Sequence, residues 1–156
     1  MNPKGGKAVA TREFLTFGLG QEEYGIPILS VQEIIGYQAA TPVPNTPPWM
    51  SGVINIRGLV IPVFDVRRKF GMTPGAYDKT SVTIVNRVGS RVMGIVVDQV
   101  HDVLALPDAA IQPTPEMSGG IDPAFITGLG RVAGRVVMLL DIQRLLEDGM
   151  AVEQAA

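Results

Sequence analysis

Short apolar runs, separated by glycine, proline and asparagine, recur along most of the chain. They are rich in valine, isoleucine and phenylalanine, which is typical of β-strands. Paired runs flank short polar breaks and predict four hairpins, at residues 14–17 with 24–28, 53–56 with 59–66, 81–85 with 92–97, and 129–132 with 135–142. Strands at this spacing favour barrels or a sandwich over alternating β–α–β units.

Helical patterns are few and short. Apolar residues at positions 28, 31, 34 and 35 follow helical spacing, with Pro27 near the start and Gly36 at the end. This pattern predicts a helix over residues 27–35. Single turns of helix are predicted at residues 107–111 and 141–146.

An internal repeat organises the chain. Residues 52–70 align without a gap with residues 128–146, and VQEI at 31–34 aligns with VHDV at 100–103. The aligned pairs include Gly52 with Gly128, Gly58 with Gly134, Asp65 with Asp141, and Arg68 with Arg144. The repeat predicts one domain at 13–148, made of halves 13–78 and 79–148, with a flexible N-terminal tail at 1–12 and a C-terminal tail at 149–156. Because such small halves are marginally stable alone, we expect them to share a core, with a groove between them.

Composition excludes several classes of protein. The 156 residues are 46% hydrophobic and 18% charged, with a net charge of −2, which argues against a charge-driven binder of nucleic acid or membrane surfaces. The chain has no cysteine and one histidine, so neither a metal site nor a cofactor is expected. Its apolar runs are far shorter than a membrane helix needs, and a cytoplasmic protein without direct membrane insertion is expected.

No set of residues predicts catalysis. Glu22 and Glu23 lie in a predicted turn and are interpreted as solvated. His101 and Asp102 are neighbours on a predicted strand and would point to opposite faces, so His101 is interpreted as solvated or facing a partner. Asp65 and Asp141 are interpreted as helix N-caps. The protein is therefore not expected to be an enzyme.

A few residues could instead contact a protein partner. Val31, Ile34, Val100 and Val103 are related by the repeat and could either pack in the core or contact a partner. Arg57 lies in a predicted turn, and its repeat counterpart is Ala133, so the fold itself does not require an arginine there. A guanidinium at the rim of an apolar groove is a good anchor for a partner.

Several longer motifs resemble one known family. They are QEEYGI-x-IL-x-VQEI-x-GY at 21–37, NTP at 45–47, G-V-x-N-x-R-G-x-x-x-P-V-x-D at 52–65, GIVVD-x-V-x-DVL at 94–104 and TGLG at 127–130. In this order and over nearly the whole chain, they resemble the CheW-like family of bacterial chemotaxis coupling proteins. The resemblance implies a mainly β fold, with two five-stranded SH3-like β-barrels around a common hydrophobic core and few short helices.

The resemblance also implies an adaptor that couples methyl-accepting chemoreceptors to the histidine kinase CheA and performs no chemistry. The cytoplasmic tip of the receptor would bind in the groove between the barrels, and the regulatory domain of the kinase at the first barrel. Carried over by position, the receptor-binding residues are Val31, Gly52, Arg57, Val82, Val100 and Val103, and the kinase-binding residues are Ile28, Glu33 and Val60. A second kinase contact would use Gln112 and Met117, where family members often carry arginine and phenylalanine. The free chain is expected to be a monomer that is recruited to membrane-associated receptor arrays.

An alternative function is that of a small SH3- or OB-like barrel that binds nucleic acid or another ligand. Such a protein needs a basic groove with interleaved aromatic residues. Here aromatic residues are only 6% of the chain, and the one basic cluster is Arg67-Arg68-Lys69. The sequence therefore favours the adaptor.

Overall fold

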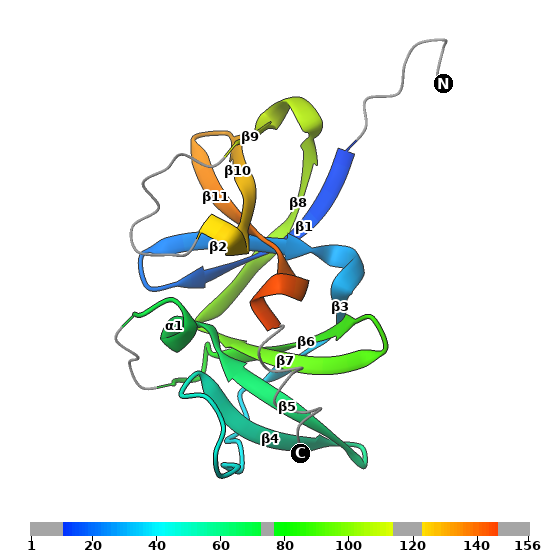
Figure 1. The fold of residues 1–156 in the computed structure, drawn as a ribbon. Helices are drawn as coiled ribbons and strands as arrows, with labels where there is room; N and C mark the ends of the chain where they lie inside the picture. The colour runs from blue at the N-terminus through cyan, green and yellow to red at the C-terminus, as the bar shows by residue number, and fades with distance from the viewer. Residues whose placement is uncertain (1–10, 73–76, 114–122, 147–156) are drawn as a thin grey trace.

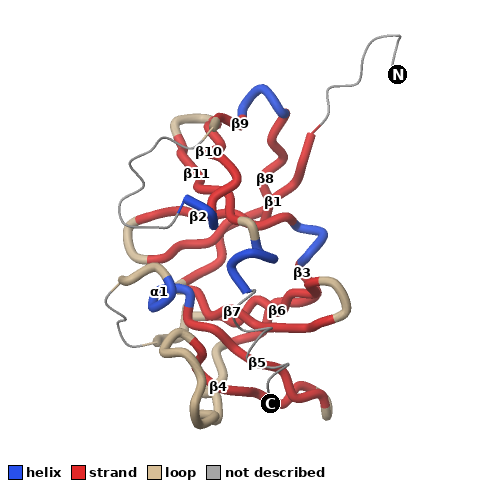
Figure 2. Tube along the Cα trace, viewed as in Figure 1, coloured by secondary structure: helices blue, strands red, loops and turns tan. Residues whose placement is uncertain are grey.

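The computed structural model describes residues 11–72, 77–113 and 123–146, and most of this trace is strand (Figures 1 and 2). In chain order the elements are β1 (Thr11–Leu19), β2 (Glu22–Pro27), η1 (Ile28–Ser30), β3 (Val31–Gly36), β4 (Met50–Ile56), β5 (Leu59–Asp65), α1 (Val66–Lys69), β6 (Val82–Val88), β7 (Arg91–Val97), β8 (Gln99–Pro107), η2 (Asp108–Ala110), β9 (Ile111–Gln112), η3 (Pro123–Phe125), β10 (Ile126–Val132) and β11 (Arg135–Leu140). Residues 142–146 are helical. The predicted tails 1–12 and 149–156 lie almost entirely outside the described residues, and β1 already begins at Thr11.

Two sheets form the molecule, and Figure 1 shows them one above the other. Sheet A has the strand order β8-β1-β2-β11-β10-β9, and sheet B has the order β3-β6-β7-β5-β4. The predicted mainly β fold is confirmed, and the sixth strand of sheet A is the two-residue β9. All pairings within the sheets are antiparallel except β11 with β2 and β5 with β7.

The sequence repeat reappears in the strand pairing. Replacing each strand of sheet B by its repeat copy turns the order β3-β6-β7-β5-β4 into β8-β1-β2-β11-β10, which is the order in sheet A. The registers agree residue by residue: Ile56 pairs with Leu59 in sheet B, and Val132 pairs with Arg135 in sheet A. Sheet B therefore takes three strands from the first half of the sequence and two from the second, and sheet A takes two from the first half and four from the second, so neither half contains a complete sheet.

A hydrophobic core lies between the sheets. It joins buried residues of sheet A, such as Phe17 and Tyr24, to buried residues of sheet B, such as Ile84 and Ile95. Residues 142–146 lie between the two sheets in Figure 1, and Ile142 and Leu146 belong to the same cluster. Smaller clusters around Ile61 and Leu106 pack within sheet B and sheet A, respectively. The expected common core is thus present.

The predicted helix at residues 27–35 is wrong. Only Ile28–Ser30 form a 3-10 turn, and the chain then enters β3, which pairs antiparallel with β6. In β3 the half-buried Val31, Glu33 and Ile35 alternate with exposed residues, which is the two-residue period of a strand. The β-branched Val31, Ile34 and Ile35 favour that conformation. The repeat could have shown this, because the aligned segment VHDV forms the strand β8.

The short helical turns were predicted correctly. The Asp65 carboxylate accepts hydrogen bonds from the backbone N–H groups of Arg67 and Arg68 at the start of α1. The Asp141 carboxylate accepts one from the N–H of Arg144, at 3.1 Å. Both aspartates are therefore N-caps, as their spacing in the repeat predicted. Every helix in residues 11–72, 77–113 and 123–146 is too short or too polar to cross a membrane.

Candidate functional site

The turn between β4 and β5 positions Arg57 in solvent. Arg57 and Gly58 both have positive φ angles, 50° and 88°, as a type I′ hairpin turn requires. The Gly58 N–H donates a 2.9 Å hydrogen bond to Oδ1 of Asn55 and closes the turn. In the repeat copy Ala133 has a φ of 48°, so the same turn forms without arginine. The Arg57 side chain is therefore not required by the fold.

Arg57 forms an ion pair with Glu33 on β3. The Arg57 side chain is 72% exposed and that of Glu33 is 27% exposed. The Glu33 carboxylate raises the pKa of the Arg57 guanidinium through this hydrogen bond. The family resemblance assigned Glu33 to the kinase and Arg57 to the receptor, and the structure places the two side chains against each other.

We call the end of sheet B at the β4–β5 turn its open end, and the end of sheet A at the β10–β11 turn the open end of sheet A. Beside the Glu33–Arg57 ion pair, the open end of sheet B is hollowed. A cavity of about 180 Å³ is lined by Gln32, Glu33, Ile56, Arg57, Leu59, Ile61, Val85 and Val92. A second cavity of about 290 Å³ is lined by Leu59, Val60, Ile61, Ser90, Arg91 and Val92. The two cavities share Leu59, Ile61 and Val92, and we call them together the Leu59 hollow. Leu59 and Val60 are 52% and 57% exposed, which is unusual for two adjacent large apolar residues.

Four further predicted residues lie at the margin of the core between the sheets. Ile28, Val31, Val82 and Val100 are partly buried and pack against that core. Val31 on β3 and Val100 on β8 are repeat copies in equivalent pairings, opposite Asn86 and Phe17. Val103 on β8 is 50% exposed. The margin therefore presents partly exposed apolar side chains from both sheets.

Gly52 has a structural role. Its φ is +142°, and a Cβ built on it would lie 2.1 Å from the carbonyl oxygen of Thr41. Thr41 pairs with Val53 through two backbone hydrogen bonds, of 2.8 and 2.9 Å. The absence of a side chain at Gly52 allows the segment before β4 to lie against the sheet.

Of the two residues predicted to form a second kinase contact, the structure describes only Gln112. Gln112 is exposed on β9, where it pairs with Leu129 at the edge of sheet A. Met117 lies outside the described residues.

Sequence reasoning missed a polar network over the open end of sheet A. The Arg135 guanidinium lies 2.6 Å from Oε2 of Glu23 and 3.0 Å from Oδ1 of Asp102. His101 Nδ1 lies 2.8 Å from Oε2 of Glu23, and the Thr16 hydroxyl donates to Asp102. Arg135 lowers the pKa of Glu23, and Arg135 together with Thr16 lowers that of Asp102 to about 2. Glu23 is therefore not merely solvated, and a signal was present: its aligned residue in the repeat is the apolar Val92.

A second missed network joins the two sheets. Arg67, with a side chain only 7% exposed, lies 3.3 Å from Oδ1 of the buried Asp65 and 3.3 Å from Oδ1 of Asp98. Asp98 in turn accepts a 2.7 Å hydrogen bond from the N–H of Gly20 in the β1–β2 turn of sheet A. The Tyr77 hydroxyl donates to Asp65, and burial, followed by this contact, raises the pKa of Tyr77 to about 12.

Comparisons with known proteins agree with one another. The model of the CheW-like domain family matches residues 13–150. The protein named chemotaxis protein CheW in Klebsiella aerogenes is 48% identical over 135 residues, covering 86% of this chain and 81% of that protein. A probable chemotaxis protein CheW from Rhizobium etli is 38% identical over 137 residues, covering 88% of each chain. The crystal structure of the scaffolding protein TtCheW from Thermoanaerobacter tengcongensis has a TM-score of 0.82 at 30% identity, covering 88% of this chain and 94% of that one. The chain belongs to the CheW-like domain family.

Proposed function

We propose that this protein is a non-enzymatic adaptor of a chemotaxis pathway that couples methyl-accepting chemoreceptors to the histidine kinase CheA. The observation that carries the proposal is the family match over residues 13–150, which spans both sheets. Two separate apolar surfaces support it, since an adaptor must bind two partners at once. These surfaces are the Leu59 hollow and the core margin.

The kinase regulatory domain is proposed to bind at the open end of sheet B. The Leu59 hollow offers an apolar centre, which is the usual location of binding hot spots. Glu33 and Val60 line its two cavities, and the Glu33–Arg57 ion pair gives it a charged rim. Ile28 on η1, which packs at the core margin, is proposed as a further kinase contact.

The receptor tip is proposed to bind along the core margin, at Val31, Val82, Val100 and the exposed Val103. Arg57 would anchor the receptor at the rim, because its guanidinium stays largely exposed despite its ion pair. Gly52 would contribute only by shaping β4. A second kinase contact is proposed at Gln112, which lies on sheet A, and at Met117. Recruitment by receptors would place the adaptor at membrane-associated arrays.

Glu33→Lys is expected to weaken binding of the kinase regulatory domain about tenfold or more, or about 1.4 kcal/mol. The lysine would remove a carboxylate from the edge of the hollow and set a second cation beside Arg57. Binding of the receptor tip should change less than kinase binding, because the core-margin valines are untouched and the Arg57 guanidinium, already 72% exposed, is retained. Titration of each partner separately by calorimetry measures both effects.

Asp108→Lys is the matched control, because Asp108 also pairs with an exposed arginine, Arg12, at 3.5 Å. Arg12 lies on β1 of sheet A and Asp108 on the 3-10 turn η2 that follows β8. Reversing the charge of Asp108 should leave the affinities for the kinase and for the receptor tip unchanged. An undiminished kinase affinity for Glu33→Lys, or equal losses toward the two partners, would refute the assignment of Glu33.

A further inference from the structure

The two sheets present nearly identical rims at their open ends. The β4–β5 hairpin and the β10–β11 hairpin have the same register, so Val60 corresponds to Val136. Val60 and Val136 are 57% and 48% exposed. A partner that recognised only these rims would find two equivalent binding places on one molecule.

The centres of the two open ends differ in chemistry. In sheet B the Leu59 hollow is lined by Leu59, Val85 and Val92. The corresponding residues of sheet A are Arg135, Thr16 and Glu23. Glu33 corresponds to Asp102, and both carboxylates pair with an arginine. The arginines are at different positions, because the counterpart of Arg57 is Ala133 and Asp102 pairs with Arg135 instead. Three apolar residues are thus replaced by a cation, a hydroxyl and an anion.

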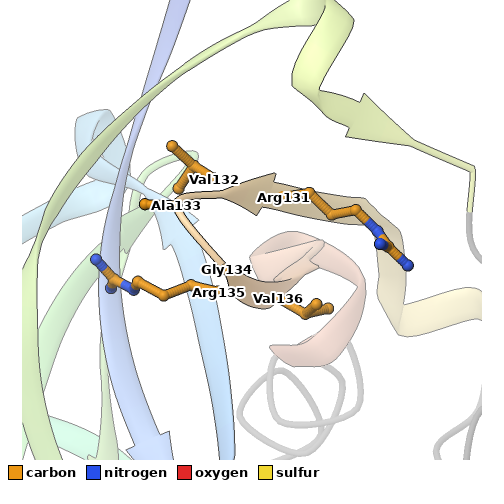
Figure 3. A pocket seen from close by; sticks show the side chains of 6 residues that line it. All are labelled: Arg131, Val132, Ala133, Gly134, Arg135 and Val136. Atoms are coloured by element: carbon orange, nitrogen blue, oxygen red, sulfur yellow. The ribbon is translucent and has the colours of Figure 1, made fainter.

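These polar residues bind one another rather than a partner. Arg135 bridges Glu23 on the neighbouring strand β2 to Asp102 on β8, through contacts of 2.6 to 3.2 Å. Thr16 holds Asp102 through its hydroxyl, and the Asp102 N–H donates back to that hydroxyl at 3.1 Å. Figure 3 shows that Arg135 and Arg131 extend to opposite sides of the β10–β11 hairpin. Arg135 is therefore committed to the network.

We propose that Glu23, Asp102 and Arg135 are specificity determinants, which make the open end of sheet A too polar for the apolar surface that the Leu59 hollow accepts, although a cavity of about 240 Å³ lies at its β10–β11 hairpin (Figure 3). An apolar side chain entering there would separate the ion pairs and leave charged groups without partners or water, which opposes binding. The network thereby limits this mode of kinase docking to sheet B. The inference rests on the proposed docking of the kinase at the Leu59 hollow.

A low-risk variant tests the principle first. Leu59→Arg gives the hollow of sheet B the arginine that sheet A carries at the corresponding position, Arg135. The Leu59 side chain is already 52% exposed. Kinase binding should fall tenfold or more, whereas Leu59→Met should bind within about threefold of the unaltered chain. If Leu59→Arg binds the kinase as well as Leu59→Met does, charge in the hollow does not exclude the partner and the proposal is overturned.

The decisive experiment makes the open end of sheet A apolar. Starting from the chain with Leu59→Arg, the substitutions Glu23→Val, Ala133→Arg and Arg135→Leu give sheet A most of the chemistry of the Leu59 hollow. Thr16 is kept, because its hydroxyl holds Asp102 in place. The new arginine would sit in the backbone conformation that Arg57 occupies, since Ala133 and Arg57 have φ angles of 48° and 50°. It would pair with Asp102 as Arg57 pairs with Glu33.

Calorimetric titration with the histidine kinase should show binding restored to within about threefold of the unaltered chain. Thermal melting and receptor-tip binding establish that each variant is folded. A folded variant that binds the receptor tip but not the kinase would overturn the proposal. Failure of the unaltered chain to bind the kinase would instead refute the proposed function, so the two failures are distinguishable.

Discussion

Arg67→Met is expected to lower the free energy of unfolding by about 3–5 kcal/mol. Arg67 and Arg68 both pair with Asp65, whose side chain is 2% exposed, and of these two arginines Arg67 is the buried one. Methionine fills much of the same volume but leaves the Asp65 carboxylate without its buried counterion. The Asp98 carboxylate loses its contact with Arg67 as well, and with it the link from α1 to the β1–β2 turn.

Urea unfolding, followed by circular dichroism, measures this loss. Arg68→Met is a matched control at the next residue, because the Arg68 side chain is 53% exposed and lies 3.9 Å from Asp65. It should change stability by less than about 1 kcal/mol. Equal losses for the two variants would show that the buried network contributes nothing beyond a surface ion pair.

Gly52→Ala is expected to destabilise the protein by about 3 kcal/mol or more, since backbone strain and a steric clash add. The added Cβ would lie 2.1 Å from the Thr41 carbonyl oxygen and 2.6 Å from its carbonyl carbon. Backbone atoms cannot move aside as a flexible side chain can, so the Thr41–Val53 pairing must break. Any loss of receptor binding by this variant would then follow from loss of structure.

Gly36→Ala provides the comparison, because no atom lies within 4 Å of a Cβ at Gly36 in β3. Its melting temperature should stay within a few degrees of that of the unaltered chain. If Gly52→Ala melts at the same temperature but fails to bind the receptor tip, Gly52 contacts the partner directly and the structural explanation is wrong.

Local patterns were sufficient to predict the hairpins and caps. Arg57-Gly58 and Gly89-Ser90 form turns between paired strands, and Asp65 and Asp141 cap helical turns. Each of these features depends on residues that are close in sequence. The repeat predicted the shared core, because halves of this size cannot bury enough surface alone.

Features that depend on distant residues were beyond the sequence. Residues 28–35 fit a helical period as well as a strand, and pairing with β6 decided in favour of β3. The exchange of strands between the halves cannot be read from either copy of the repeat, since the aligned residues are the same for exchanged and unexchanged sheets. Arg67 looked like part of a surface basic cluster, yet contacts with Asp65 and Asp98 hold it in the interior.

The same limit applies to the candidate site. Glu33 and Arg57 are 24 positions apart, and only the folding of β3 beside the β4–β5 hairpin brings them together. Arg135 and Glu23 are 112 positions apart, and they meet because β11 pairs with β2 across the two halves. A comparison of aligned positions of the repeat would have shown that Glu23 and Arg135 replace the apolar Val92 and Leu59. It would not have shown that the two residues contact each other.

One molecule of this protein is proposed to hold the receptor and the kinase together. Sedimentation of receptor-bearing membrane vesicles with CheA, in the presence and absence of the protein, tests this linkage. We expect the kinase to sediment with the vesicles only when the protein is present, and Glu33→Lys to reduce the sedimented kinase while the protein itself stays bound. Kinase that sediments equally without the protein, or kinase that displaces the protein from the vesicles, would contradict the account.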